Sequence, residues 1–168
     1  MKTVPQTRAE LMLLTRLIED IPVAVLTAVK ADGALASRPV ALLEMDDHGA
    51  FWSYTDARTA KLEYLRAMHL GFTGPAQGTY VSASGEGQIV TDRGRIERLW
   101  TPMARPWFPD GPGSPSLALL KFVPEAATCW DAPNSSMARV FDLTPSAPAD
   151  QPVAMGRHAP PPAMSTPA

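Results

Sequence analysis

The chain has 168 residues, of which 45% are hydrophobic and 19% charged, with a formal net charge of −2 and an isoelectric point near 5.9. This length suits one domain with one hydrophobic core, and the near-balanced charge argues against a nucleic-acid-binding protein, which needs a basic surface for phosphates. The single cysteine, Cys129, excludes an intramolecular disulfide, and neither the charged N-terminal segment nor the apolar stretch 21–29 fits a signal peptide or a membrane span, so we expect a cytoplasmic protein without a membrane partner.

The first half of the chain is predicted to form one helix followed by an antiparallel meander. Thr7 and Glu10 form a capping box that opens an amphipathic helix, and Pro22 ends it. The dipeptide Asp32-Gly33 favours the positive φ angles of a tight turn, so the apolar segments on either side are predicted to pair as a hairpin. The predicted helix covers about 7–20, and the predicted strands cover about 23–31, 34–45 and 50–55.

The second half alternates short helices with strands. Asp56 and Asp92 are each placed to cap a helix. Gly85 and Gly87 lie on one face of the predicted strand 79–90, which indicates a bulge, a sharp bend or the close approach of another group to the backbone. The first helix covers about 57–68, and the strands cover about 71–73, 79–90 and, as one strand or a pair, 117–130. This hairpin order favours a mainly β fold with peripheral helices, a small closed or partly closed barrel.

Proline makes up 18 of the 168 residues, about twice its usual share of ~5%. Eight prolines lie in the last 37 residues, where alanine and proline together account for 16. We therefore divide the chain into a domain over 1–131 and an Ala/Pro-rich extension over 132–168. Within the extension a short helix is predicted over 134–143, and the remainder is predicted to be disordered because it offers little apolar surface to bury.

Five further prolines lie in the segment 102–115, which also carries Trp107 and Phe108. Because proline restricts φ, this loop has few backbone conformations. One interpretation is a surface connector whose aromatic side chains close the core. The other is a pre-formed loop that holds Trp107 over a ligand or a partner subunit.

No motif identifies a catalytic residue. The three histidines, His48, His69 and His158, are scattered and lack the ligand spacing of a metal site, so we expect no metal. The chain has neither a phosphate-binding P-loop nor a nucleophile elbow. Cys129 lies in an apolar segment and is predicted to be a buried, inert thiol.

The segment Ser53–Lys61 is a candidate phosphate site, because it places hydroxyls and cations at the start of a predicted helix. Free helix N–H groups favour an anion, hydroxyls donate directional hydrogen bonds, and a lysine adds a full charge. Alternatively, these residues are ordinary capping residues in solvent. Asp56 would repel a phosphate unless it points away or is neutralised by Arg58.

Arg38 is the second candidate, because it interrupts a strand of otherwise small and apolar residues. It either points into solvent or lies along the sheet toward residues 53–61. In the second case it could bond a carbonyl of a planar ring, with the backbone of Pro39 and Val40 against that ring.

The order of these motifs resembles the general stress protein 26 branch of the pyridoxamine 5′-phosphate oxidase-like, FMN-binding split-barrel proteins. The resemblance covers about residues 7–131 and rests on the order and spacing of several short segments. In chain order they are SRPV at 37–40, SYTDARTAK at 53–61, YVSASG at 80–85, LWTPMARPWFP at 99–109 and WD at 130–131.

This resemblance implies a six-stranded antiparallel split β-barrel that forms a homodimer and binds FMN at the subunit interface. By position, it implies that the flavin ring lies along Arg38, Pro39 and Val40. It implies that the phosphate is bound by Thr55, Thr59 and Lys61, with Ser53 and Tyr54 nearby, and that Trp107 contacts the cofactor from the second protomer.

The chain also departs from the oxidases of this family. Ala60 stands where they carry an arginine next to the phosphate lysine, which leaves Arg58 as the candidate substitute. Their late Arg-x-His substrate pair is missing, since Arg157 and His158 are adjacent. We therefore do not expect a true pyridoxamine phosphate oxidase.

The resemblance leaves three functions open. The first is an FMN-dependent oxidoreductase that takes a hydride from a reduced nicotinamide, NAD(P)H, with the protein supplying orientation and electrostatics. The second is a non-catalytic stress protein that sequesters or senses flavin. The third is a structural dimer without a cofactor. The sequence contains no dedicated acid or base that separates them.

Overall fold

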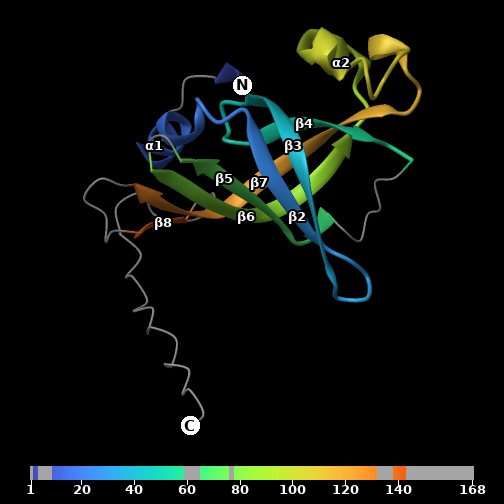
Figure 1. Cartoon of the computed structure of the whole chain (residues 1–168). Helices are drawn as coiled ribbons and strands as arrows, with labels where there is room; N and C mark the ends of the chain where they lie inside the picture. Colours follow the sequence, from blue (N-terminus) through green and yellow to red (C-terminus); the bar gives the residue numbers. More distant parts are fainter. Residues whose placement is uncertain (1, 4–8, 59–64, 76–77, 132–137, 143–168) are drawn as a thin grey trace.

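Six antiparallel strands close a barrel in the order β2, β5, β6, β7, β4, β3, and the ring is completed by the pairing of β3 with β2 (Figure 1). The computed structural model describes residues 2–3, 9–58, 65–75, 78–131 and 138–142. Short strands β1 and β8 add to β3 and β7. This confirms the mainly β, six-stranded split-barrel fold. The strands are β1 (Lys2–Thr3), β2 (Val23–Val29), β3 (Leu35–Met45), β4 (Phe51–Asp56), β5 (Met68–Gly74), β6 (Thr79–Val90), β7 (Leu117–Asp131) and β8 (Ala138–Asp142).

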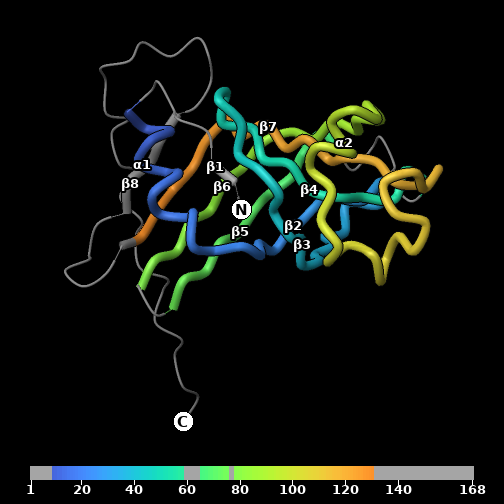
Figure 2. Tube along the Cα trace, turned by 90° about the horizontal axis from the view of Figure 1, so that it is seen from above, coloured from blue at the N-terminus to red at the C-terminus, as the bar shows by residue number. Residues whose placement is uncertain are grey.

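Two short α-helices lie at opposite ends of the barrel in the described part of the chain (Figures 1 and 2). Helix α1 (Ala9–Ile18) buries an apolar stripe that includes Leu14 and Ile18 against the barrel interior. Helix α2 (Arg93–Leu99) begins after Asp92, whose carboxylate accepts a hydrogen bond from the Arg95 N–H at 2.9 Å, as predicted for a cap. The proline loop that follows contains two 3₁₀ turns, η2 (Pro102–Ala104) and η3 (Gly111–Gly113).

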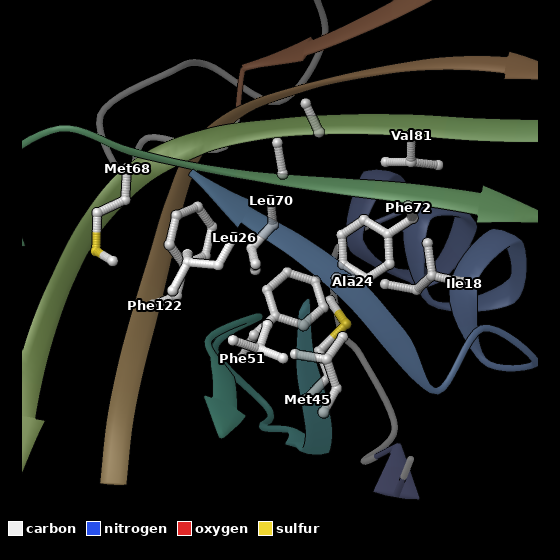
Figure 3. Packing of buried hydrophobic residues seen from close by; sticks show 14 of the residues in the cluster. Ile18, Ala24, Leu26, Met45, Phe51, Met68, Leu70, Phe72, Val81 and Phe122 are labelled. Carbon is white, nitrogen blue, oxygen red and sulfur yellow. The ribbon is translucent and has the colours of Figure 1, made fainter. Parts of the chain in front are cut away.

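The hydrophobic core has two parts, and β4 contributes to both. Phe51 points into the barrel, where its ring centroid lies 5.5 Å from that of Phe72 and 6.2 Å from that of Phe122 (Figure 3). The next residue, Trp52, belongs to a second buried cluster with residues of α2 and the proline loop. Because side chains alternate along a strand, β4 separates the barrel interior from α2.

The structure confirms one predicted turn and one predicted irregularity in the strand pairing. Gly33 has φ +80° between β2 and β3, and the Lys30 N–H donates to the Ala34 carbonyl at 2.8 Å, which closes the predicted hairpin. The pairing of β6 with β7 shifts register between Ser84 and Gly85, which is the predicted bulge.

Two predicted helices need correction. Residues 138–142, predicted to be helical, form β8, which pairs with residues 126–130 of β7. A strand edge offers a row of backbone donors and acceptors, and Val140 and Phe141 suit that extended partner. The helix predicted over 57–68 ends too late, because Met68 already belongs to β5.

Several other predictions can be placed only in part. Residues 59–64, in the middle of the predicted 57–68 helix, lie outside the described residues, as do residues 143–168 of the extension. Residues 117–131 form one long strand rather than a pair. No helix in the described part of the chain is long and apolar enough to cross a membrane.

Candidate functional site

Strands β3 and β4 separate and leave the barrel split between them. They pair only where residues 42–45 face residues 51–53. Strand β3 continues along β2 back to Leu35, and β4 continues along β7 to Asp56. Among the described residues, no strand fills the space between the first half of β3 and the second half of β4. Each strand therefore presents one free backbone edge to this split.

The free edge of β3 is built around Pro39. The Leu42 N–H donates to the Pro22 carbonyl at 3.0 Å, on the β2 side of the strand. Backbone groups alternate along a strand, so those of Pro39 and Ala41 point to the other side, toward the split. Proline has no N–H and leaves no unpaired donor there. The Ala41 N–H and the Pro39 carbonyl remain for a ligand.

Arg38 lies on the face of β3 that lines the barrel. It alternates with Val40 and Leu42, which are both in the core, and its cross-strand neighbour on β2 is the buried Leu26. The Arg38 side chain is exposed where the barrel opens. No hydrogen bond or ion pair with the rest of the described chain engages its guanidinium group. Arg38 therefore shares the face of the core residues, at its exposed end.

Ser53 and Thr55 lie on the matching face of β4, in line with Phe51. Ser53 pairs with Leu42 at the point where the strands separate, and only 4% of its surface is exposed. Neither hydroxyl makes a hydrogen bond within residues that the structure describes. Because no described group takes this hydroxyl, Ser53 keeps its hydrogen-bonding capacity for a ligand in the split. The fold thus brings Arg38, Val40, Ser53 and Thr55 to one face.

Asp56 is neutralised by Arg58, as the phosphate hypothesis requires. The Arg58 guanidinium donates to both oxygens of the Asp56 carboxylate, with Nη2 2.6 Å from Oδ2 and Nε 3.0 Å from Oδ1. These hydrogen bonds and the positive charge hold the pKa of Asp56 below its ordinary value. Arg58, the candidate substitute for a phosphate-binding arginine, is therefore paired with Asp56. Thr59 and Lys61 lie outside the described residues.

Tyr54 points to the opposite face of β4, away from the split. Its hydroxyl donates to the Leu99 carbonyl at 2.7 Å and accepts from the Thr101 N–H at 3.0 Å. Its ring packs against Trp100 and Phe108. Burial is the main cause of its raised pKa. The Tyr54 side chain therefore does not join the other predicted site residues, although its backbone lies between two of them.

The two aromatic residues of the proline loop behave differently. Phe108 is buried in the cluster between β4 and α2. The Trp107 side chain is exposed, and the residue as a whole is 76% exposed, while its backbone N–H donates to the Ala104 carbonyl at 3.0 Å. Phe108 therefore closes the core, and Trp107 remains available to a ligand or a partner.

Sequence reasoning missed a buried charge network that attaches α2 to the barrel. Glu44 of β3, 4% exposed, accepts from Arg95 Nη2 at 2.7 Å and lies 3.4 Å from Arg98 Nη1. The Arg95 guanidinium also lies 3.5 Å from the ring centroid of Trp52. The signal in the sequence is the acidic Glu44 inside an apolar strand. The network joins α2 to the strand that carries Arg38.

A second surface, on the outside of the barrel, is unusually apolar. We call it the outer apolar face and define it by the exposed Val23, Val25, Val29 and Leu35 of β2 and β3. The polar residues among them are already paired, since the Thr27 and Ser37 hydroxyls lie 2.8 Å apart. On neighbouring β5, His69 Nε2 lies 2.8 Å from Ser82 Oγ, and burial lowers the pKa of His69. An exposed apolar surface of this kind is typical of an interaction site.

The chain is similar to one protein family and to several solved structures. The family model described as pyridoxamine 5′-phosphate oxidase like matches residues 10–151. A Clostridium acetobutylicum protein related to general stress protein 26 is 21% identical, with a TM-score of 0.66 over 79% of this chain and 93% of that one. General stress protein 26 of Bacillus anthracis is 19% identical, with a TM-score of 0.62 over 71% and 92%.

A third solved structure is described by its ligand. It is the general stress FMN/FAD binding protein of Xanthomonas citri, 24% identical, with a TM-score of 0.54 over 87% of this chain and 96% of that one. At these identities the likeness concerns the fold. No curated protein is similar enough to this sequence to count as a match.

Proposed function

Because this chain belongs to the pyridoxamine 5′-phosphate oxidase-like family, we propose that it binds FMN in the split between β3 and β4 and acts as a flavin-dependent oxidoreductase. The observation that carries the proposal concerns Ser53, which is only 4% exposed, has no hydrogen-bond partner for its hydroxyl in the described chain and shares a face with Arg38. The FMN/FAD binding recorded for the Xanthomonas citri protein supports the choice of ligand class.

The residues at the split suit a flavin mononucleotide. A flavin ring is planar and carries carbonyl acceptors and one N–H donor. The β3 edge offers the Ala41 N–H and the Pro39 carbonyl to those groups, and Arg38 adds a cation for a ring carbonyl. Thr55, with Thr59 and Lys61 beyond the described residues, is assigned to the phosphate, because hydroxyls and lysine bind phosphate oxygens.

When bound, FMN supplies the capacity to accept a hydride and to pass electrons on. The chain's own residues then bind and orient it. Arg38 stabilises negative charge at the ring, and the buried Val40 and Leu42 keep water out of the barrel side of the split. The described side chains that we place at the split, those of Arg38, Val40, Ser53 and Thr55, include no histidine, cysteine or carboxylate, so no acid or base is assigned.

We do not propose that the substrate is pyridoxamine phosphate. Ala60 replaces the family's second phosphate-binding cation, and Arg58, its candidate substitute, is bound to Asp56. The adjacent Arg157 and His158 do not reproduce the oxidases' substrate pair. We propose NAD(P)H as the electron donor.

We further propose a homodimer in which the outer apolar face is covered by a second copy of the chain. Burying exposed aliphatic side chains drives association, and already paired hydroxyls such as Thr27 and Ser37 lose little on leaving water. FMN is then bound near the interface, and Trp107 contacts it from the second protomer. This assignment agrees with the 76% exposure of Trp107 in the single chain.

The phosphate assignment predicts that FMN binds more tightly than riboflavin, which lacks the phosphate. Lys61→Ala is expected to weaken FMN binding by ~1–3 kcal/mol, the range for a charge-assisted hydrogen bond, and to leave riboflavin binding unchanged. Quenching of flavin fluorescence measures both affinities. Lys30→Ala, at the exposed hairpin turn, is the matched control and should change neither. Equal affinity for FMN and riboflavin in the unmodified protein would contradict the assignment.

A second function, flavin sequestration or sensing, is favoured because the described residues at the split include no acid or base. The FMN-loaded protein is expected to oxidise NAD(P)H faster than the same concentration of free FMN, because orientation at the site lowers the barrier. The decrease in absorbance of the reduced nicotinamide gives the rate. A rate equal to that of free FMN would leave sequestration or sensing as the function, and a protein that takes up no FMN would be the cofactor-free dimer.

A further inference from the structure

We propose that Tyr54 is a positioning residue, which acts on FMN binding through Trp107 rather than by touching the cofactor. Its side chain ties the strand that borders the split to the loop that carries Trp107. The proposal rests on the proposed FMN site and assigns a role to a residue whose side chain faces away from it.

The Tyr54 hydroxyl holds the point where the chain leaves α2. Leu99 is the last residue of that helix, and carbonyls in the last turn have no partner within a helix. Tyr54 donates to the Leu99 carbonyl and accepts from the N–H of Thr101, where the loop begins. With one donor and one acceptor used, the hydroxyl has made its main hydrogen bonds. The exit from α2 is therefore set by β4.

Backbone hydrogen bonds between residues close in sequence connect Thr101 to Trp107. The Ala104 N–H donates to the Thr101 carbonyl at 3.1 Å, and the N–H groups of Trp107 and Phe108 both donate to the Ala104 carbonyl at 3.0 Å. The Phe108 ring packs against the Tyr54 ring, with 6.3 Å between the ring centroids. Tyr54 thus contacts the loop on both sides of Trp107, so the Trp107 backbone is held while its side chain is exposed.

An exposed tryptophan whose backbone is fixed by hydrogen bonds is well placed to bind a ligand. A side chain that is already placed loses little conformational entropy on binding, and tryptophan contributes a large apolar area. On the other face of β4, Ser53 and Thr55 flank Tyr54 and border the split. One strand therefore sets the polar contacts of its own protomer's split and the position of the Trp107 that contacts the partner's cofactor in the proposed dimer.

A double-mutant cycle tests this role. FMN dissociation constants are measured by flavin fluorescence for the unmodified protein, Tyr54→Phe, Trp107→Ala and the double variant. Tyr54→Phe keeps the ring and removes the hydroxyl. We expect it to weaken FMN binding about tenfold when Trp107 is present and less than about twofold when Trp107 is alanine. Thr15→Val is the control, because it removes a buried hydroxyl hydrogen bond on α1, at the other end of the barrel.

The outcomes separate the two proposals. If the unmodified protein binds FMN and Tyr54→Phe costs the same in both backgrounds, the positioning role is wrong while the FMN site stands. If the unmodified protein binds no FMN, both are wrong. Should Tyr54→Phe fail to fold, amide hydrogen exchange of the unmodified protein decides, because a Thr101 N–H held by Tyr54 must be protected. Fast exchange at Thr101 would overturn the proposal.

Discussion

Gly85→Ala is expected to lower the free energy of unfolding by about 3 kcal/mol, because the new methyl group has no space at the β6 bulge. A Cβ at this position would overlap the Val123 carbonyl oxygen and lie 2.9 Å from the Pro124 Cα. These are backbone atoms of β7, which cannot turn aside as a side chain can. Pro124, which has no N–H, lies opposite Gly85 where the ladder shifts register.

Gly94→Ala is the matched control for Gly85→Ala. Gly94 lies in α2 and is exposed, and the nearest atom to its added Cβ is an Asp92 oxygen at an ordinary 3.4 Å. Alanine has a higher helix propensity than glycine, so we expect Gly94→Ala to raise the free energy of unfolding by about 0.5–1 kcal/mol. Urea unfolding followed by circular dichroism measures both changes. A Gly85→Ala protein as stable as the unmodified one would mean that the bulge can move.

Val25→Glu is expected to convert the proposed dimer into a monomer. Val25 is 49% exposed on the outer apolar face, between Pro39 of β3 and Gly71 of β5. A carboxylate at this point would have to leave water without a partner on dimerisation, which is costly. We expect the dimer dissociation constant to rise at least about 100-fold, or about 2.8 kcal/mol. Sedimentation equilibrium over a range of protein concentrations measures it.

Met12→Glu is the control for surface charge. Met12 is 44% exposed on α1, off the outer apolar face, so the same new charge should leave the dimer intact. The two variants also test where FMN lies. If the site is shared between protomers, Val25→Glu weakens FMN binding and Met12→Glu does not. A Val25→Glu protein that remains dimeric would place the interface elsewhere.

Local chemistry was readable from the sequence wherever one or two residues decide the backbone. Gly33 adopts a positive φ that other residues avoid, and the Asp92 carboxylate accepts a hydrogen bond from a free N–H at the start of α2. Both effects act within four residues and need no distant partner. Residues 138–142 show the opposite case, because the edge of β7 offers them a strand ladder that no local pattern announces.

The candidate site divides in the same way. The sequence showed which residues could bind a ligand, since arginine, serine and threonine in neighbouring segments suggest an anion and a polar ring. It did not show which way their side chains point, because a one-residue change in strand register turns every side chain to the other face. Arg38 and Ser53 face the split and Tyr54 faces α2 only because β3 and β4 pair at residues 42–45 and then separate. The Glu44 network escaped notice because its arginines come from a helix about 50 residues further along the chain.

The sequence by itself determined the fold class, the hairpin order and the identity of the residues available for chemistry, because turns, caps and the alternation of apolar residues act over short distances. Tertiary structure alone decided which of those residues meet. It directed Tyr54 to the proline loop, left Trp107 exposed on a held backbone and left a buried Ser53 without a partner in the described chain beside the open barrel. The physical reason is that strand register and closure depend on pairing between segments far apart in the chain, and no short pattern encodes it.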